Sequence, residues 1–312
     1  MRIIFFGTAD ISKFFLQNID KKHEIVSVIT MCDKPVGRAN KIKAPAVKEY
    51  AIEKNIPYIQ VDKFNDEIAE KIKLLNPDVG VVVSFGKIIP EKVFMLPKYR
   101  CFNIHFSLLP KYRGASPVQQ SLIDGCQKTG VTAFYIEKGL DTGDILLQKE
   151  LDIDYNDTSE TLFEKLNLIG VDIMNETLNL LETGNVVSQK QNGEPSFCSI
   201  FTKENAKIDW NKTAESIYNL YRGLYLWPKI FCMIADGRMS GKMMKIIKCS
   251  VVKDASNKLP GTIIEIRKGE GFVVKCKENA LFITEVQPES KAKMSAFDFV
   301  NGAQIRPGSR LS

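Results

Sequence analysis

The first half of the chain alternates short apolar runs with amphipathic stretches, a pattern typical of strands and helices in succession. The apolar runs predict strands at Ile3–Phe6, Glu24–Thr30, Val79–Val83, Arg100–Phe106 and Val131–Ile136. Helical periodicity predicts helices at Ile11–Ile19, Ala46–Glu53 and Thr158–Glu182. We therefore expect an α/β domain built on a Rossmann-like, mostly parallel sheet, with its binding site at the carboxyl ends of the strands.

A different pattern begins behind a polar segment that lacks apolar periodicity. After a predicted helix at Thr213–Arg222, short strands alternate with Gly, Asn and Asp turns, at Ile230–Ala235, Met243–Val252, Gly261–Ile266, Gly271–Lys275 and Ala280–Glu285. This spacing is typical of a small β-barrel, and we predict an OB-like one. The expected organisation is a first domain at 1–183, a linker at 184–204 and a smaller β-barrel domain at 205–312.

Composition limits the kinds of catalytic site and the cellular location that we expect for this protein. The 312 residues are 44% hydrophobic and 26% charged, and no segment has the long apolar run of a membrane span. No small-residue cleavage site follows the first apolar run, so we expect a cytoplasmic protein. Seven scattered cysteines without a C-x-x-C pair, together with only two histidines, exclude the common zinc-binding patterns. We expect chemistry without a metal.

Charge divides unevenly between the two halves. Residues 205–312 hold 18 Lys and Arg against 10 Asp and Glu, whereas residues 1–204 hold 25 against 27. A basic second domain is typical of a protein that meets a polyanion, although a solvated basic surface has the same composition. Charge alone leaves both interpretations open.

The densest group of reactive side chains lies at the fourth predicted strand, in the run Asn103-Ile104-His105-Phe106-Ser107-Leu108-Leu109-Pro110. Residues two apart on a strand share a face, so Asn103 and His105 are expected to point toward one site. Asn offers a neutral donor for a developing oxyanion, and His exchanges a proton near neutral pH. A single histidine beside a strand is also compatible with a purely structural role.

Two further loops are candidates for the same edge of the sheet. Gly139-Leu140-Asp141-Thr142-Gly143-Asp144 can carry Asp141 toward His105 as an orienting carboxylate, or it can serve only as an Asp-Gly turn. Gly7-Thr8-Ala9-Asp10 follows the first strand but lacks the G-x-G-x-x-G pattern. We interpret it as a tight turn from strand to helix.

A basic loop follows the second predicted strand. It carries four cations: Lys34, Arg38, Lys41 and Lys43. An ordinary surface loop has this composition, and so does a loop that guides a phosphate backbone into a cleft.

In this order, the motifs resemble the methionyl-tRNA formyltransferase family. The run that begins at Asn103 and ends in Arg113-Gly114-Ala115-Ser116-Pro117 is similar to the family's folate and catalytic signature, and the Gly139–Asp144 loop to its second signature. Similarity continues through Lys207-Ile208-Asp209-Trp210, Trp227-Pro228, Pro260-Gly261-Thr262-Ile263 and Pro307-Gly308-Ser309-Arg310-Leu311. Ala9 departs from the pattern, because the family usually has proline there.

The resemblance implies a formyltransferase that uses 10-formyltetrahydrofolate as a cosubstrate, needs no metal and acts on initiator methionyl-tRNA. It assigns catalysis to Asn103, His105 and Asp141. It assigns the folate pocket to Ser107, Leu108, Leu109 and Pro110, and contacts with the tRNA to Arg38, Lys41 and Lys43. It further implies that residues 205–312 bind along the tRNA. We see no apolar seam for a partner and expect a monomer that does not enter a membrane.

Three other functions compete with this one. A formyltransferase for glycinamide ribonucleotide or an amino sugar would keep the chemistry but leave the basic charge of residues 205–312 unexplained. A nucleotide-binding oxidoreductase would need the missing glycine fingerprint. A non-catalytic RNA-binding module would have no use for the Asn-x-His and Leu-Asp-Thr-Gly motifs.

Overall fold

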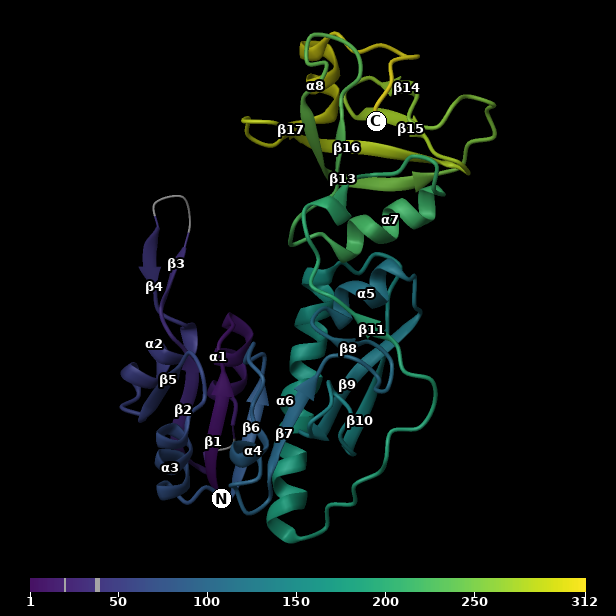
Figure 1. The fold of residues 1–312 in the computed structure, drawn as a ribbon. Helices are drawn as coiled ribbons and strands as arrows, with labels where there is room; N and C mark the ends of the chain where they lie inside the picture. Colours follow the sequence, from purple (N-terminus) through teal and green to yellow (C-terminus); the bar gives the residue numbers. More distant parts are fainter. Residues whose placement is uncertain (20, 37–39) are drawn as a thin grey trace. The chain divides into compact units, whose positions relative to one another are not determined.

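The structure is a computed structural model that describes residues 1–19, 21–36 and 40–312 (Figure 1). Its backbone groups into two compact units. The first unit comprises residues 1–114, 128–152 and 164–198, and the second comprises 115–127, 153–163 and 199–312. Each unit has its own sheet.

A seven-stranded sheet lies at the centre of the first unit, in the order β10-β9-β7-β6-β1-β2-β5. Its strands are β1 (Arg2–Gly7), β2 (Glu24–Met31), β5 (Tyr58–Val61), β6 (Val79–Val83), β7 (Cys101–His105), β9 (Lys128–Tyr135) and β10 (Ile145–Asp152). The five strands from β5 to β7 run parallel, whereas β9 is antiparallel to both β7 and β10. The predicted α/β fold with a mostly parallel sheet is confirmed.

Helices cover both faces of this sheet, which is why its central strands are apolar on both faces. They are α1 (Asp10–Gln17), α2 (Ala46–Glu53), α3 (Asp66–Leu74), α4 (Glu91–Phe94) and α6 (Ser159–Thr183). On one face, Ile4 and Phe6 of β1 share a core cluster with residues of α3 and α4. On the opposite face, Phe15 of α1 packs edge-on against Phe106. Gly170 lets α6 approach the Phe15 ring closely.

Two small pairs of strands accompany the main sheet. The basic loop contains a hairpin of β3 (Lys34–Val36) and β4 (Lys41–Lys43). β8 (Arg113–Gly114) pairs in parallel with β11 (Phe197–Cys198), so a segment predicted as linker is hydrogen-bonded to the chain just beyond the Asn-x-His motif.

The second unit is built on an antiparallel sheet in the order β12-β13-β16-β15-β14, with β17 paired to β16. Its elements are α5 (Pro117–Ile123), η1 (Glu204–Ala206), α7 (Ala214–Gly223), β12 (Phe231–Met233), β13 (Met243–Val252), β14 (Ile263–Arg267), β15 (Gly271–Lys275), β16 (Ala280–Pro288), β17 (Met294–Ser295) and α8 (Ala296–Ala303). The predicted strands are present, and one core cluster joins residues of the sheet to α7 and α8. The OB-like barrel stays a prediction.

Candidate active site

The strand β7 holds Asn103 and His105 in the interior of the sheet. Asn103 lies beside Val82 of β6 and opposite Phe134 of β9. His105 is only 6% exposed, and its ring meets that of Phe134 edge-on, with 6.2 Å between centroids. Because β7 has a hydrogen-bonded strand on each side, the sheet fixes the directions in which both side chains leave the backbone.

Two oxygen atoms flank the imidazole of His105. Its Nε2 lies 2.8 Å from the carbonyl oxygen of Tyr112. A carbonyl only accepts hydrogen bonds, so Nε2 carries a proton in this arrangement. On the other side, Nδ1 lies 3.8 Å from Oδ2 of Asp141, which is too long for a hydrogen bond but within the range of an ion pair with a protonated ring. The structure therefore brings His105 and Asp141 together.

Asp141 lies in the loop that connects β9 to β10, with a left-handed backbone (φ 51°) that Asp tolerates better than most residues. Its Oδ2 accepts a hydrogen bond of 2.7 Å from the backbone N–H of Gly114. A Cβ atom at Gly143 would lie 1.7 Å from the carbonyl oxygen of Tyr135, so only glycine permits this approach of the loop to β9. The loop thus delivers one carboxylate to the edge of the sheet.

The turn that follows β7 is held by its own buried polar groups. Ser107 donates from Oγ to the carbonyl oxygen of Lys111 at 2.6 Å, and its own carbonyl accepts from Thr132 Oγ1 at 2.6 Å. Ser107 and Leu109 are buried, whereas Leu108 and Pro110 are half-buried. The predicted contacts of these four residues with folate stay predictions. The Ser107 hydroxyl already donates its hydrogen bond within the turn.

The turn after β1 is tied to the loop after β6. Thr8 donates from Oγ1 to the carbonyl oxygen of Phe85 at 2.8 Å, and Ser12 donates from Oγ to the carbonyl oxygen of Val83 at 2.7 Å. These bonds fix the chain at the carboxyl ends of two parallel strands, where ligands bind in folds of this kind.

Comparisons with known proteins identify the family of this chain. Residues 1–178 match the formyl transferase family model, and residues 200–304 match the model of the formyl transferase C-terminal domain. The chain is 46% identical over 312 residues to the methionyl-tRNA formyltransferase of Endomicrobium trichonymphae, with both chains covered completely. It is 43% identical over 311 residues to that of Clostridioides difficile strain 630, with 99% of each chain covered. The chain belongs to the methionyl-tRNA formyltransferase family.

Solved structures of more distant proteins share the fold. The sugar 3N-formyl transferase WlaRD, crystallised with dTDP and 5-N-formyl-THF, superposes with a TM-score of 0.67 at 24% identity, covering 94% of this chain and 99% of its own. HypX from Aquifex aeolicus, in complex with tetrahydrofolic acid, superposes with a TM-score of 0.63 at 16% identity, covering 96% of this chain and 47% of its own. Both of these proteins therefore share the fold of this chain.

The basic loop of this family member is described in part. Arg38 lies outside the described residues, and Lys41 is placed by its backbone in β4. Lys43, at the end of β4, is exposed. At the base of the hairpin, Lys48 donates to Asp33 at 2.8 Å, and this hydrogen bond lowers the pKa of the Asp33 carboxyl group. Of the three predicted tRNA contacts, Lys43 is therefore the one whose side chain the structure shows to be exposed to solvent.

Five of the seven cysteines of this formyltransferase family member are buried. Among the described residues, no three His, Cys, Asp or Glu side chains gather closely enough to hold a metal ion. The seven cysteines are free thiols. Burial raises the pKa of Cys232 to about 12 and that of Cys276 to about 12, which leaves both protonated and unreactive at neutral pH. No helix in the described residues has the length and apolar character of a membrane span.

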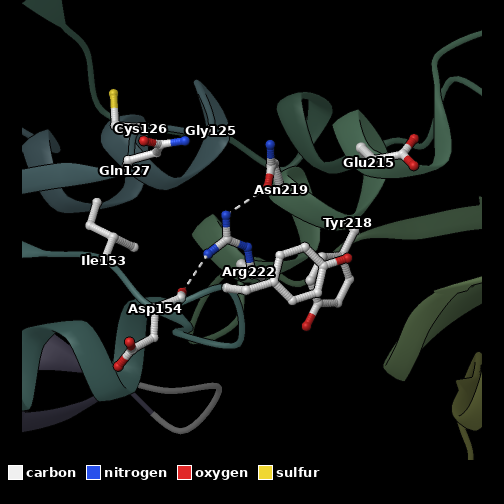
Figure 2. Close-up of a pocket in the computed structure, with 10 residues that line it drawn as sticks. Gly125, Cys126, Gln127, Ile153, Asp154, Glu215, Tyr218, Asn219 and Arg222 are labelled. Atoms are coloured by element: carbon white, nitrogen blue, oxygen red, sulfur yellow. Dashed lines mark hydrogen bonds between the residues drawn. The ribbon is translucent and has the colours of Figure 1, made fainter.

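Each unit contains a cavity whose lining does not include His105. In the first unit, a cavity of about 660 Å³ lies between Val61–Phe64 and Gly86–Pro90, at the carboxyl ends of β5 and β6. In the second unit, a cavity of about 450 Å³ is bordered by α7 (Figure 2). There Arg222 donates to Asn219 Oδ1 at 2.6 Å and to the Asp154 carbonyl oxygen at 3.3 Å, and burial lowers the pKa of its guanidinium. Because Nη1 and Nη2 already donate to protein oxygens, this arginine is a structural link within the second unit.

Two residues outside the predicted site contact its loops. Gln191 donates to the carbonyl oxygens of Asp141 and Gly143 at 2.8 and 2.9 Å. Ser196 accepts from the backbone N–H of Tyr112 at 2.9 Å. Both lie in the polar segment predicted as linker, where no periodicity or local motif distinguishes them.

Proposed function

We propose that the chain transfers the formyl group of 10-formyltetrahydrofolate to the α-amino group of initiator methionyl-tRNA, giving N-formylmethionyl-tRNA. The observation that carries this proposal is the meeting of His105 and Asp141 beside Asn103, at the carboxyl edge of the sheet, in a chain 46% identical over its full length to a methionyl-tRNA formyltransferase. Asn103, His105 and Asp141 are the proposed catalytic residues.

In the proposed reaction, the methionyl amine attacks the formyl carbon, and the carbonyl oxygen becomes an oxyanion. The tetrahedral intermediate collapses when the bond from the formyl carbon to N10 of the folate breaks. The amine loses one proton and N10 gains one, so the reaction is balanced without an oxidant or a reductant. Asn103 donates to the oxyanion, a contribution of about 10²–10³ in rate for one such donor.

His105 is the proposed proton carrier, through Nδ1. Because Nε2 donates to the Tyr112 carbonyl, Nδ1 is the ring nitrogen left to gain or lose a proton. Asp141 faces that nitrogen at 3.8 Å and favours the protonated ring as the ammonium proton departs. The Tyr112 carbonyl and the Asp141 carboxylate would then hold the imidazole from opposite sides.

The folate would bind between the loop after β6 and the loop before β10. Each loop leaves a large apolar side chain in solvent: Ile88 is 91% exposed and Leu140 is 61% exposed. Exposed apolar groups beside a polar site are typical of surfaces that a ligand covers, and a flat heterocycle needs such walls. The turn at Ser107–Pro110 is the proposed third wall.

The tRNA would meet Arg38, Lys41 and Lys43, together with the basic region at 205–312. That region has an excess of eight positive charges, and phosphate contacts supply much of the affinity for nucleic acid. The division into a catalytic domain at 1–183, a linker at 184–204 and a tRNA-binding domain at 205–312 is part of this proposal. So are the monomeric state, the cytoplasmic location and the absence of a metal requirement.

The direct test of this function compares acceptors. The purified chain, with radiolabelled 10-formyltetrahydrofolate, should formylate charged initiator tRNA and leave glycinamide ribonucleotide and amino sugars unmodified. Formylation of the small amines without formylation of charged tRNA would refute the acceptor assignment. Activity that persists after dialysis against a chelator is the expected result for a reaction without a metal.

Replacing Lys43 by alanine should weaken tRNA binding and flatten its dependence on salt. Loss of one phosphate contact lowers the slope of log K against log salt concentration by roughly one, and Arg38→Ala should act similarly. Titration of charged tRNA at several salt concentrations measures this slope. Lys71→Ala, which removes an exposed lysine paired with Glu67 on α3, serves as control. Equal slopes for Lys43→Ala and this control would contradict a phosphate contact.

A further inference from the structure

The segment at 189–198 lies along the active-site loops of the first unit. Gln189 pairs with Ile145 of β10 through two backbone hydrogen bonds of 2.7 and 2.8 Å. At the other end of the segment, β11 pairs with β8, and Arg113 donates from its backbone N–H to the Ser196 carbonyl oxygen at 2.8 Å. The segment therefore joins the start of β10 to the chain at Tyr112–Gly114.

The chain at Tyr112–Gly114 in turn touches both reactive side chains. The carbonyl of Tyr112 accepts from His105, and the N–H of Gly114 donates to the Asp141 carboxylate at 2.7 Å. Gly114 has φ 114°, and a Cβ atom there would lie 2.3 Å from the carbonyl oxygen of Cys198. The contact between this chain and the segment at 189–198 is thus too close for any side chain, and a shift of the segment would move His105 and Asp141 relative to each other.

Gln191 is the side chain that connects the two loops directly. Its Nε2 donates to the carbonyl oxygens of Asp141 and Gly143 at 2.8 and 2.9 Å. Its Oε1 accepts from Nε and Nη2 of Arg113 at 3.2 and 2.6 Å. One half-buried amide thus uses both of its polar atoms to bind the Asp141 loop on one side and the residue next to Gly114 on the other.

We propose that Gln191 is a positioning residue for formyl transfer, which holds the Asp141 loop so that the Asp141 carboxylate stays beside Nδ1 of His105. This inference rests on the proposed function. Gln191 contacts neither His105 nor the Asp141 carboxylate, so it acts through the backbone of the loop. Misplacement of a catalytic group by about 1 Å can lower the rate roughly a hundredfold, and four hydrogen bonds from one amide are well suited to prevent it.

The first test measures the full-length Gln191→Ala variant. We expect kcat for formylation of charged initiator tRNA to fall by about tenfold to a hundredfold, with KM for tRNA and for folate changed by less than about twofold. Gln189→Ala is the matched control, because its side chain is exposed and its backbone pairing with Ile145 survives the substitution. Thermal unfolding of each variant reports any general loss of stability.

Two further variants separate positioning from general stabilisation. Gln191→Glu retains an acceptor for Arg113 but loses the donor to the Asp141 loop, so it should show the same loss of kcat. In an Asp141→Asn background, Gln191→Ala should lower single-turnover formylation by less than about threefold, because the carboxylate that it positions is already gone.

Three results would overturn the positioning role: a wild-type kcat in Gln191→Ala, a wild-type kcat in Gln191→Glu, or an equal loss in both Asp141 backgrounds. If Gln191→Ala does not fold, Gln191→Glu decides the outcome. Failure of the unmodified chain to formylate charged tRNA would instead refute the proposed function, so the two failures are distinguishable.

Discussion

Asp141→Asn should lower kcat for formylation of charged initiator tRNA by about a thousandfold or more, by analogy with loss of an orienting carboxylate beside a catalytic histidine. The amide has the shape of the carboxylate, and its oxygen can still accept from the Gly114 N–H. What the variant lacks is the negative charge 3.8 Å from Nδ1 of His105. The expected loss is therefore electrostatic, with the fold and the loop retained.

Single-turnover formylation with enzyme in excess over charged tRNA measures this effect without interference from product release. Asp152→Asn is the matched control, because Asp152 ends the strand that follows the same loop and its side chain is 82% exposed. The control should retain wild-type kcat. An Asp141→Asn enzyme that retains more than about a tenth of wild-type kcat would contradict a role for its charge, since orienting carboxylates contribute far more than that.

The positions of the principal catalytic candidates are predictable from sequence because strand periodicity and motif coincide at β7. The run at Arg100–Phe106 predicts a strand, which the structure has as β7 at Cys101–His105, and residues two apart on it share a face. Asp141 is reached by a different argument, since its loop contains two glycines and two carboxylates beside a predicted strand. The structure places it 3.8 Å from His105, although 36 residues separate them along the chain.

Other features leave no trace in local sequence patterns. β8 and β11 are two residues long, which is too short for periodicity, and they form because distant segments meet. β10 is an edge strand with several exposed polar residues, so its apolar signal is weak. The contacts to His105 and Asp141 come from a backbone carbonyl at Tyr112 and a backbone N–H at Gly114, and every residue except proline has both groups. The role of Gln191 cannot be predicted from the sequence for a related reason, because it depends on the groups that the side-chain amide contacts in the folded chain.

His105→Ala should lower kcat by about 10²–10⁴, the range that general acid–base groups contribute. The substitution removes the ring nitrogen that faces Asp141, and it removes the imidazole N–H that donates to the Tyr112 carbonyl. Because His105 is only 6% exposed, alanine creates a cavity bounded by Phe134, Tyr112 and Asp141 rather than an open surface. Some loss of thermal stability is therefore expected along with the loss of rate.

That cavity allows the chemical role to be separated from the structural one. Added imidazole should restore part of the kcat of His105→Ala, because the small molecule can occupy the space between the Tyr112 carbonyl and the Asp141 carboxylate. The rescue should require Asp141, so it should be absent from His105→Ala combined with Asp141→Asn. His105→Asn, which has no group that exchanges a proton near neutral pH, should stay inactive even where it folds as stably as the parent chain. Wild-type kcat in a stable His105→Asn enzyme would show that the imidazole only supports the fold, and the proposed path of the proton would then need another carrier.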